Sequence, residues 1–207
     1  ITPESEAKCR DLLSPLRSEG VFTPPSFEGS IFFPWWGGGI NWGGASYDPE
    51  RSLLVTSIKR LPSFMKLVER ESEDEGNMQG TPYISSGGIL SGDEGFPCIA
   101  PPWGELVGVN LDSGEIDWRV PIGYSQPKGS PDEKFLGSSF WGGPITTAGG
   151  LAFMAGSKDG HLRAFDIDNG NELWSAKLPA GGQATPMSYE VNGKQYVVIA
   201  AGGHGSL

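Results

Sequence analysis

The sequence contains few of the residues on which several classes of protein depend. Cysteine occurs only at Cys9 and Cys98, which excludes a disulfide-dense scaffold and a Cys-x-x-Cys motif for metal or haem attachment. Lys and Arg number 15 against 25 Asp and Glu, and the formal net charge of −10 argues against a nucleic-acid-binding surface, where basic residues must contact phosphates. No apolar run approaches the roughly 20 residues of a membrane-spanning helix.

Glycine and aromatic residues are abundant by contrast. Gly accounts for 32 of the 207 residues, about twice its usual share of roughly 7%. Gly and Pro together make up 49 of the 207 residues, just under the share that suggests disorder, but aromatic residues make up 11% of the chain and short apolar runs recur along it. The composition therefore predicts a packed, turn-rich β protein.

Only one segment, residues 3–19, predicts a helix. Thr2 can cap its amino end, and Pro3 suits the first turn because its ring already fixes the helical φ. Leucines give the segment one apolar face, and Gly20 is a natural stop. Beyond this point the pattern changes to short strands separated by Gly, Pro, Asp and Asn.

The strongest signal in the sequence is an internal repeat. Residues 108–118 align with residues 164–174, and both segments predict a strand, a tight turn and a return strand that carries a tryptophan. Gly114 and Gly170 occupy the same place in the two turns, 56 residues apart. Glycine tolerates the positive φ that such turns use. The repeat therefore predicts two equivalent structural units.

The residues upstream of each copy also match, since residues 42–44 and 141–143 both read Trp-Gly-Gly and lead into a strand. Each complete unit is therefore predicted to hold four short antiparallel strands. The predicted units are residues 41–120 with an insertion at 58–104, residues 141–177, and a partial, two-stranded unit at 182–207.

Four-stranded units of this size in series are typical of β-propeller blades. The predicted fold class is thus all-β, with about two and a half antiparallel blades and a short N-terminal helix in a single fragment, residues 1–207. A propeller closes with about 4–8 blades, so this number cannot close. We expect the chain to be part of a larger propeller, or to cover its open edges by association with other chains or with itself.

The tryptophans fall into two groups. Trp118 and Trp174 recur at one repeat position, where a large ring can fill the space between neighbouring blades, and this favours a packing role. Trp42 and Trp141 precede Gly-Gly pairs at the start of the innermost strands, which lie near the central channel of a propeller. For these two, lining the channel and packing are equally open.

At the paired motifs the sequence resembles the quinoprotein dehydrogenases that use pyrroloquinoline quinone (PQQ), whose blades carry a tryptophan-docking motif, Ala-x-Asp-x-x-x-Gly-x-x-x-Trp. The second copy fits at all four defined positions: Ala164, Asp166, Gly170 and Trp174. The first copy departs from it with Gly108 and Asn110. Further segments resemble the membrane-bound glucose dehydrogenase subgroup: residues 20–26, 41–44, 80–83, 96–98, 102–104, 178–187, 189–198 and 201–206.

The resemblance implies an eight-bladed periplasmic propeller anchored in the bacterial inner membrane, of which this chain is the C-terminal third. It implies PQQ in the central channel with a divalent cation, Ca²⁺ or Mg²⁺. The reaction would oxidise the anomeric carbon of an aldose such as glucose to a lactone and pass electrons to ubiquinone. In the family the catalytic aspartate and a cofactor-contacting lysine belong to upstream blades and have no match here, so no catalytic residue is assigned and the isolated chain is expected to be inactive.

Four cofactor-binding residues are carried over by the resemblance. Asn41 resembles an asparagine beside the quinone, where an amide can donate to a quinone oxygen. Trp141 resembles a tryptophan that donates its indole N–H to the cofactor. Gly203 and His204 resemble the loop that closes the channel near the cofactor edge, although His204 is equally well explained as a solvated loop histidine. No metal ligand is assigned.

Two questions stay open at the level of sequence. A non-catalytic binding or scaffold module built from the same blades is the alternative function, although the Trp-Gly-Gly and Gly-Gly-His-Gly segments favour an enzyme ancestry. A disulfide between Cys9 and Cys98 would suit an oxidising periplasm, but its formation depends on a distance that the sequence does not supply.

Overall fold

The computed structural model describes residues 2–72, 75–76, 79–92, 95–125, 135–139 and 141–203. The chain divides into two compact units, and each is described by itself. Unit 1 contains Ile1–Gly38 and Arg60–Ala100, and unit 2 contains Gly39–Lys59 and Pro101–Leu207. The described residues include no helix with the length and apolar character that a membrane span requires.

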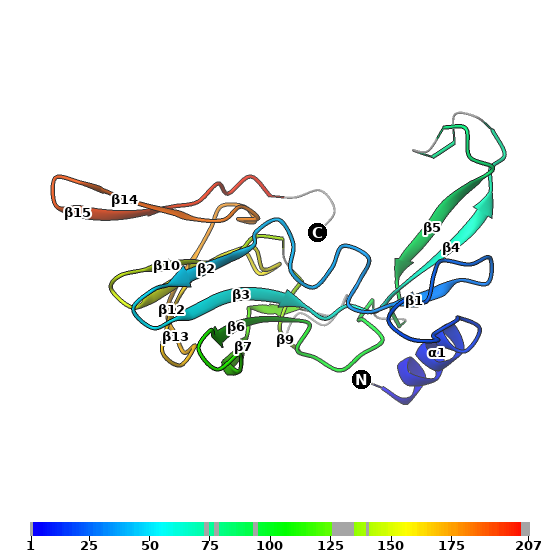
Figure 1. The fold of residues 1–207 in the computed structure, drawn as a ribbon, viewed down its shortest axis with the longest axis horizontal. Helices are drawn as coiled ribbons and strands as arrows, with labels where there is room; N and C mark the ends of the chain where they lie inside the picture. The colour runs from blue at the N-terminus through cyan, green and yellow to red at the C-terminus, as the bar shows by residue number, and fades with distance from the viewer. Residues whose placement is uncertain are drawn as a thin grey trace. The chain divides into compact units, whose positions relative to one another are not determined.

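Unit 1 combines a helix with a small sheet. Helix α1 (Pro3–Leu13) precedes an antiparallel sheet with the strand order β1 (Ser30–Phe32), β4 (Ser63–Glu69) and β5 (Tyr83–Ile89) (Figure 1). The sheet pairs a strand near the N-terminus with a hairpin from the predicted insertion. The insertion is therefore not a simple loop on the first blade, because its residues 60–100 fold with the N-terminal segment.

Helix α1 begins as predicted but ends earlier than residue 19. The Thr2 hydroxyl accepts a hydrogen bond from the Ser5 amide at 3.1 Å, which caps the amino end. The helix stops at Leu13 because Pro15 has no amide hydrogen with which to continue the backbone ladder. Beyond it, the amide of Arg17 donates to the Gly29 carbonyl at 2.9 Å, so this segment pairs beside β1.

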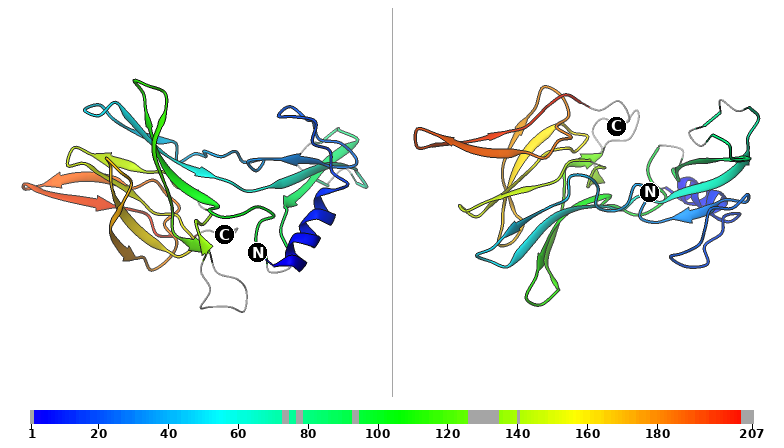
Figure 2. Two further views of the ribbon diagram at one scale, coloured as in Figure 1. Left: turned by 90° about the horizontal axis from the view of Figure 1, so that it is seen from below. Right: turned by 45° about the horizontal axis from the view of Figure 1, so that its top comes forward.

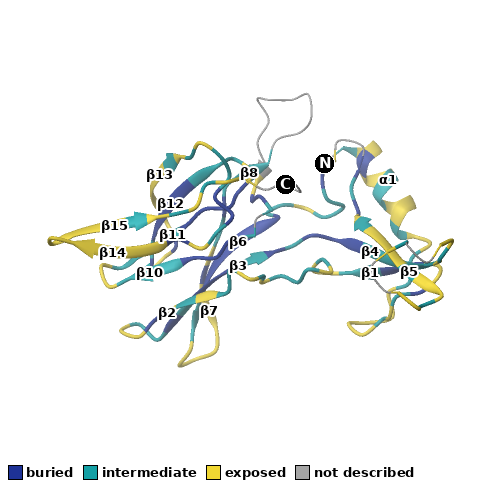
Figure 3. Cartoon of the chain, turned by 90° about the horizontal axis from the view of Figure 1, so that it is seen from above, coloured by how far each residue is buried: buried dark blue, intermediate teal, exposed yellow. Residues whose placement is uncertain are grey.

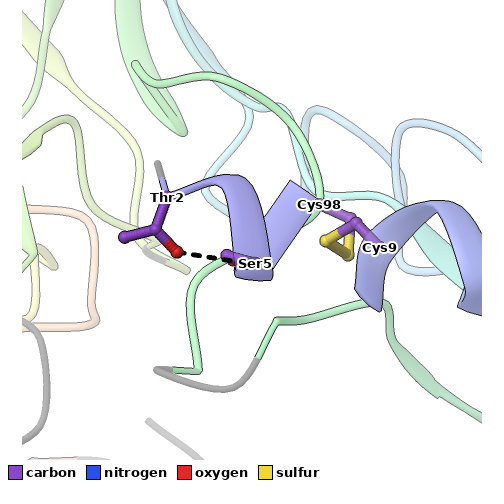
Figure 4. Close-up of a disulfide and its surroundings, with 4 residues drawn as sticks. All are labelled: Thr2, Ser5, Cys9 and Cys98. Carbon is purple, nitrogen blue, oxygen red and sulfur yellow. Dashed lines mark hydrogen bonds between the residues drawn. A yellow bond between two sulfur atoms is a disulfide. The ribbon is translucent and has the colours of Figure 1, made fainter. Parts of the chain in front are cut away.

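The two cysteines form a disulfide within unit 1. Cys9 of α1 and Cys98, in the segment after β5, have sulfur atoms 2.02 Å apart and Cα atoms 5.4 Å apart. Figure 4 shows the bond with the capped first turn of the helix beside it. The disulfide that the sequence left open is therefore present, and it ties the helix to the end of the insertion.

Unit 2 contains the two predicted four-stranded sheets. The first has the order β2 (Ala45–Asp48), β3 (Leu53–Lys59), β6 (Gly104–Asn110) and β7 (Ile116–Pro121), with every neighbouring pair antiparallel. Its strands follow one another in chain order, and the insertion lies between β3 and β6. This is the connectivity expected for a propeller blade.

The second sheet repeats this plan with β10 (Ile145–Thr147), β11 (Leu151–Met154), β12 (His161–Asp166) and β13 (Glu172–Lys177). The first strands of the two sheets, β2 and β10, lie side by side, and the Ser46 hydroxyl accepts a hydrogen bond from the Thr146 amide at 2.8 Å. The sheets thus adjoin along their first strands, as blades do around a propeller axis.

Two further strand pairs complete unit 2. The hairpin of β14 (Met187–Val191) and β15 (Lys194–Val198) forms the predicted partial blade and extends away from the four-stranded sheets (Figure 2). The short strands β8 (Tyr124–Ser125) and β9 (Phe135–Leu136) also pair. The prediction of an all-β propeller fold with a short N-terminal helix is confirmed.

The repeat is visible in the backbone of the two blades. Gly114 and Gly170 both adopt positive φ, at 77° and 75°, and both sheets have a β-bulge at the same repeat position. In the second turn, the Asp166 carboxylate accepts from the Asp168 amide at 2.8 Å. In the first, the Asn110 side-chain oxygen accepts from the Asp112 amide at 3.0 Å. An amide oxygen therefore replaces the carboxylate oxygen without loss of the turn.

A shared core joins the two blades. Burial is concentrated on their middle strands, whereas β14 is exposed along its length (Figure 3). The core consists of Leu53, Val55, Leu106, Trp118, Ile122, Ala152, Met154, Phe165 and Ile167. The predicted packing role therefore holds for Trp118, which is 8% exposed, but Trp174 is 50% exposed in this chain.

Candidate functional site

The two Trp-Gly-Gly segments meet in unit 2. A Cβ atom added at Gly43 would overlap the backbone nitrogen of Gly143, and a Cβ added at Gly143 would overlap the carbonyl oxygen of Gly43. Only glycine at both positions allows the two backbones to come this close. The paired glycines therefore bring the entries of the two innermost strands together.

This approach places the preceding tryptophans against each other. The rings of Trp42 and Trp141 are stacked, with centroids 5.1 Å apart and an angle of 14° between their planes. Trp42 is 63% exposed, whereas Trp141 is partly buried. The pair forms a flat aromatic surface at the start of β2 and β10, which is the position predicted for the wall of the central channel.

A buried lysine lies over the ring of Trp141. The ammonium nitrogen of Lys59, the last residue of β3, is 4.2 Å from the ring centroid of Trp141, within the range of a cation–π interaction. Lys59 is only 2% exposed, and this burial lowers its pKa to about 8 because removal from water disfavours the charged form. Lys59 is not among the residues predicted from the sequence, because no motif marks it within an otherwise ordinary strand.

Gln183 joins the site to the segment that precedes β14. Its side-chain oxygen accepts a hydrogen bond from the Trp141 amide at 3.0 Å, and its side-chain nitrogen donates to the Gly156 carbonyl at 2.8 Å. Gln183 is 9% exposed, and its bond to the Gly156 carbonyl is buried. This residue therefore fixes the backbone that carries the Trp141 ring. Sequence reasoning missed it too, because it is only one position within a longer matching segment.

The structure places three of the four predicted cofactor-binding residues. Asn41 directly precedes Trp42, and its side-chain oxygen accepts from the Trp42 amide at 2.8 Å. Its carbonyl accepts from the Gly44 amide at 2.9 Å, so Asn41 opens the tight turn that carries Trp42. Asn41 and Trp141 are therefore brought to one place through the stacked pair.

Gly203, which follows the β14–β15 hairpin in the chain, adjoins the segment that precedes the hairpin. Its amide donates to the carbonyl of Gly181 at 2.9 Å, two residues before Gln183. It has a φ of 73°, which favours glycine. His204 lies outside the described residues, so its predicted role stays a prediction.

Comparison with known proteins shows what the chain resembles. A family model described as PQQ: Glucose/ethanol/alcohol dehydrogenase, beta-propeller domain matches residues 1–197. The quinoprotein glucose dehydrogenase of Escherichia coli (strain K12) is 42% identical over 96% of this chain and 28% of that protein. The quinate/shikimate dehydrogenase (quinone) of Acinetobacter baylyi is 36% identical over 98% of this chain and 28% of that protein. The chain thus spans less than a third of these relatives.

Solved structures agree on the fold. The quinohemoprotein alcohol dehydrogenase from Comamonas testosteroni superposes with a TM-score of 0.61 at 23% identity, covering 84% of this chain and 24% of that one. A europium-containing methanol dehydrogenase gives a TM-score of 0.56 at 28% identity, covering 79% of this chain and 25% of that one. Both similarities involve about a quarter of a much longer chain.

Proposed function

Because the chain belongs to the β-propeller family of PQQ-dependent glucose, ethanol and alcohol dehydrogenases, we propose that it forms part of a PQQ-dependent oxidoreductase. The proposed reaction oxidises the anomeric carbon of an aldose such as glucose to a lactone and passes the electrons to ubiquinone. The observation that carries this proposal is the stacked pair of Trp42 and Trp141 beside the buried Lys59 ammonium, in a chain of this family.

The site fits the chemistry of the cofactor. PQQ is a flat, conjugated quinone that carries carboxylates, so it suits a flat aromatic surface and a nearby positive charge. The stacked tryptophans provide the surface, and Lys59 provides the charge. The Asn41 amide and the Trp141 indole N–H are donors of the kind that quinone oxygens accept.

The residues of this chain would bind and orient the cofactor. Bound PQQ supplies the redox chemistry, and the protein supplies position and electrostatics. The tryptophan pair would hold the plane of the ring system and exclude water from one face, while Asn41 would donate to a quinone oxygen. Gly203 and His204 would close the channel at the cofactor edge.

Other parts of the enzyme are proposed to lie outside this chain. The base that accepts the substrate proton is assigned to an aspartate of another blade. A lysine that contacts the cofactor is also assigned to a blade outside this chain. Ca²⁺ or Mg²⁺ would polarise a quinone carbonyl as a Lewis acid, and no residue here is assigned to hold it. The disulfide of Cys9 and Cys98 supports a periplasmic location, where such bonds persist.

The surfaces left exposed on unit 2 are proposed to pack against the remainder of the propeller. Trp174 is 50% exposed, and every residue of β14 is exposed. Tyr189 of β14 stacks on Tyr196 of β15, and both tyrosines are exposed. Self-association through these blade edges is the alternative. The mass of the chain in solution, measured over a range of concentrations, distinguishes the two: self-association requires dimers or larger species that form as concentration rises.

A chimera tests the proposed reaction. The part of the Escherichia coli relative that this chain matches would be replaced by the 207 residues, and PQQ-dependent dye reduction would be measured with glucose, quinate and glycerol. We expect turnover with glucose in the chimera and none with the 207-residue chain alone. A chimera that folds and binds PQQ but oxidises another of these substrates would contradict the aldose assignment. A folded chimera that binds no PQQ would favour a non-catalytic propeller module.

A further inference from the structure

An apolar side chain at the position of Lys59 would cost less free energy to bury than the lysine does. It is the last residue of β3 and is 2% exposed, among buried strand residues that include Val55 and Leu106. Removing an ammonium group from water is costly, and its contact with the indole face offsets part of that cost. Packing alone therefore does not account for a lysine at this position.

The backbone fixes Lys59 relative to the proposed cofactor surface. Its amide donates to the Gly39 carbonyl at 2.9 Å, two residues before Asn41, and Lys59 pairs with Gly104 across the sheet. The side chain reaches the ring of Trp141, 4.2 Å from its centroid. The ammonium is thus held by the first blade against the tryptophan of the second blade.

We propose that Lys59 is a positioning and charge-complementing residue of the cofactor pocket: it holds the Trp141 ring in place and puts a positive charge beside a carboxylate-bearing quinone. The inference rests on the proposed function, since it takes Trp141 to be part of a PQQ pocket. An anionic cofactor near a shielded cation gains more from the charge than it would in water. Lys59 therefore favours binding of the charged cofactor over a neutral analogue of the same shape.

The alternative is a purely structural role, in which the ammonium only holds the Trp141 ring through the cation–π contact. In that case, replacing the lysine would change stability but not the preference of the site for charged ligands. The two roles are separated by comparing charged and uncharged forms of one ligand.

The experiment uses the chimera and measures dissociation constants for PQQ and for its trimethyl ester, which keeps the ring system but lacks the carboxylate charges. We expect Lys59→Met to weaken PQQ binding by about tenfold and ester binding by less than about threefold. Lys59→Arg should restore most of the PQQ affinity because it restores the charge. The exposed Lys177, at the end of β13, gives the control variant Lys177→Met, which should bind PQQ as the unmodified chain does.

The outcomes distinguish this inference from the proposed function. Equal losses for PQQ and the ester, or none for either, would overturn the charge role of Lys59 while leaving the cofactor pocket intact. If the folded chimera with Lys59 unchanged binds neither ligand, the pocket itself is wrong. Thermal unfolding of each variant without ligand shows whether a loss of binding reflects a loss of folded protein.

Discussion

The indole N–H of Trp118 donates a hydrogen bond to the carbonyl oxygen of Ile167 at 2.9 Å, which joins the outermost strand of the first blade to the end of β12 in the second. The ring also covers Gly170, where an added Cβ would overlap the indole. Trp118 therefore links the outer strand of the first blade to the turn between β12 and β13 of the second, in addition to the contacts of β2 with β10.

Replacing Trp118 should separate its hydrogen bond from its packing. Trp118→Phe leaves the Ile167 carbonyl without its buried donor, and we expect a loss of about 1–3 kcal/mol in the free energy of unfolding. Trp118→Ala also leaves a cavity between the blades, so we expect about 3–5 kcal/mol. Denaturant unfolding of both variants measures these losses. The control is Trp174→Ala, at the equivalent but half-exposed position, which should lower the free energy of unfolding by less than Trp118→Ala does. Equal losses would show that the contact of Trp118 with the second blade adds no stability.

The two turn glycines provide a matched pair of substitutions. Both have φ near 75°, so alanine at either position is strained by about 1–2 kcal/mol. A Cβ at Gly114 meets no atom within 4 Å, whereas a Cβ at Gly170 meets the Trp118 ring. Gly170→Ala should therefore destabilise the protein by about 1–3 kcal/mol more than Gly114→Ala. Equal effects in denaturant unfolding would mean that the ring moves aside without cost.

The sequence predicted the blades well because their information is periodic and local. The turn glycines and the return-strand tryptophans recur 56 residues apart, and a Trp-Gly-Gly segment precedes each blade. One alignment of the two copies therefore places eight strands. The sheet of unit 1 has no such repeat, since β1 pairs with β4 across the 30 residues 33–62. The premature end of α1 follows from Pro15, a local signal that the apolar face of the helix obscured.

The candidate site was predicted only in part, for a related reason. Asn41 and Trp141 belong to short motifs, whereas Lys59 and Gln183 act through contacts between segments far apart in sequence. Nothing in the strand that ends at Lys59 distinguishes a buried lysine from an exposed one until the neighbouring blade is in place. Likewise, the equivalence of Trp118 and Trp174 in sequence does not reveal that Trp118 is buried over the turn at Gly170 while Trp174 is half-exposed.

The disulfide should stabilise unit 1 in particular. Cys9 and Cys98 are separated by 89 residues, and closing a loop of that length lowers the entropy of the unfolded chain by an amount worth about 4–5 kcal/mol. We expect Cys9→Ala with Cys98→Ala, or reduction of the bond, to lower the protection of α1 and β4 in hydrogen exchange. Protection of β3 and β12 in unit 2 should change little, and a uniform loss over both units would show that the two unfold as one.

The buried ammonium of Lys59 should make stability depend on pH on the alkaline side. Its folded pKa is lowered to about 8 by burial, below the unfolded value of about 10.4. Between these values the unfolded chain binds more protons than the folded one, so stability rises as pH increases from about 8 to about 10. Burial also lowers the pKa of Lys158, which acts in the same direction.

Lys59→Met should therefore reduce this rise in the free energy of unfolding without abolishing it, whereas Lys177→Met should leave it unchanged. An identical rise in the Lys59 variant, measured by denaturant unfolding at each pH, would mean that its ammonium stays hydrated in the folded protein.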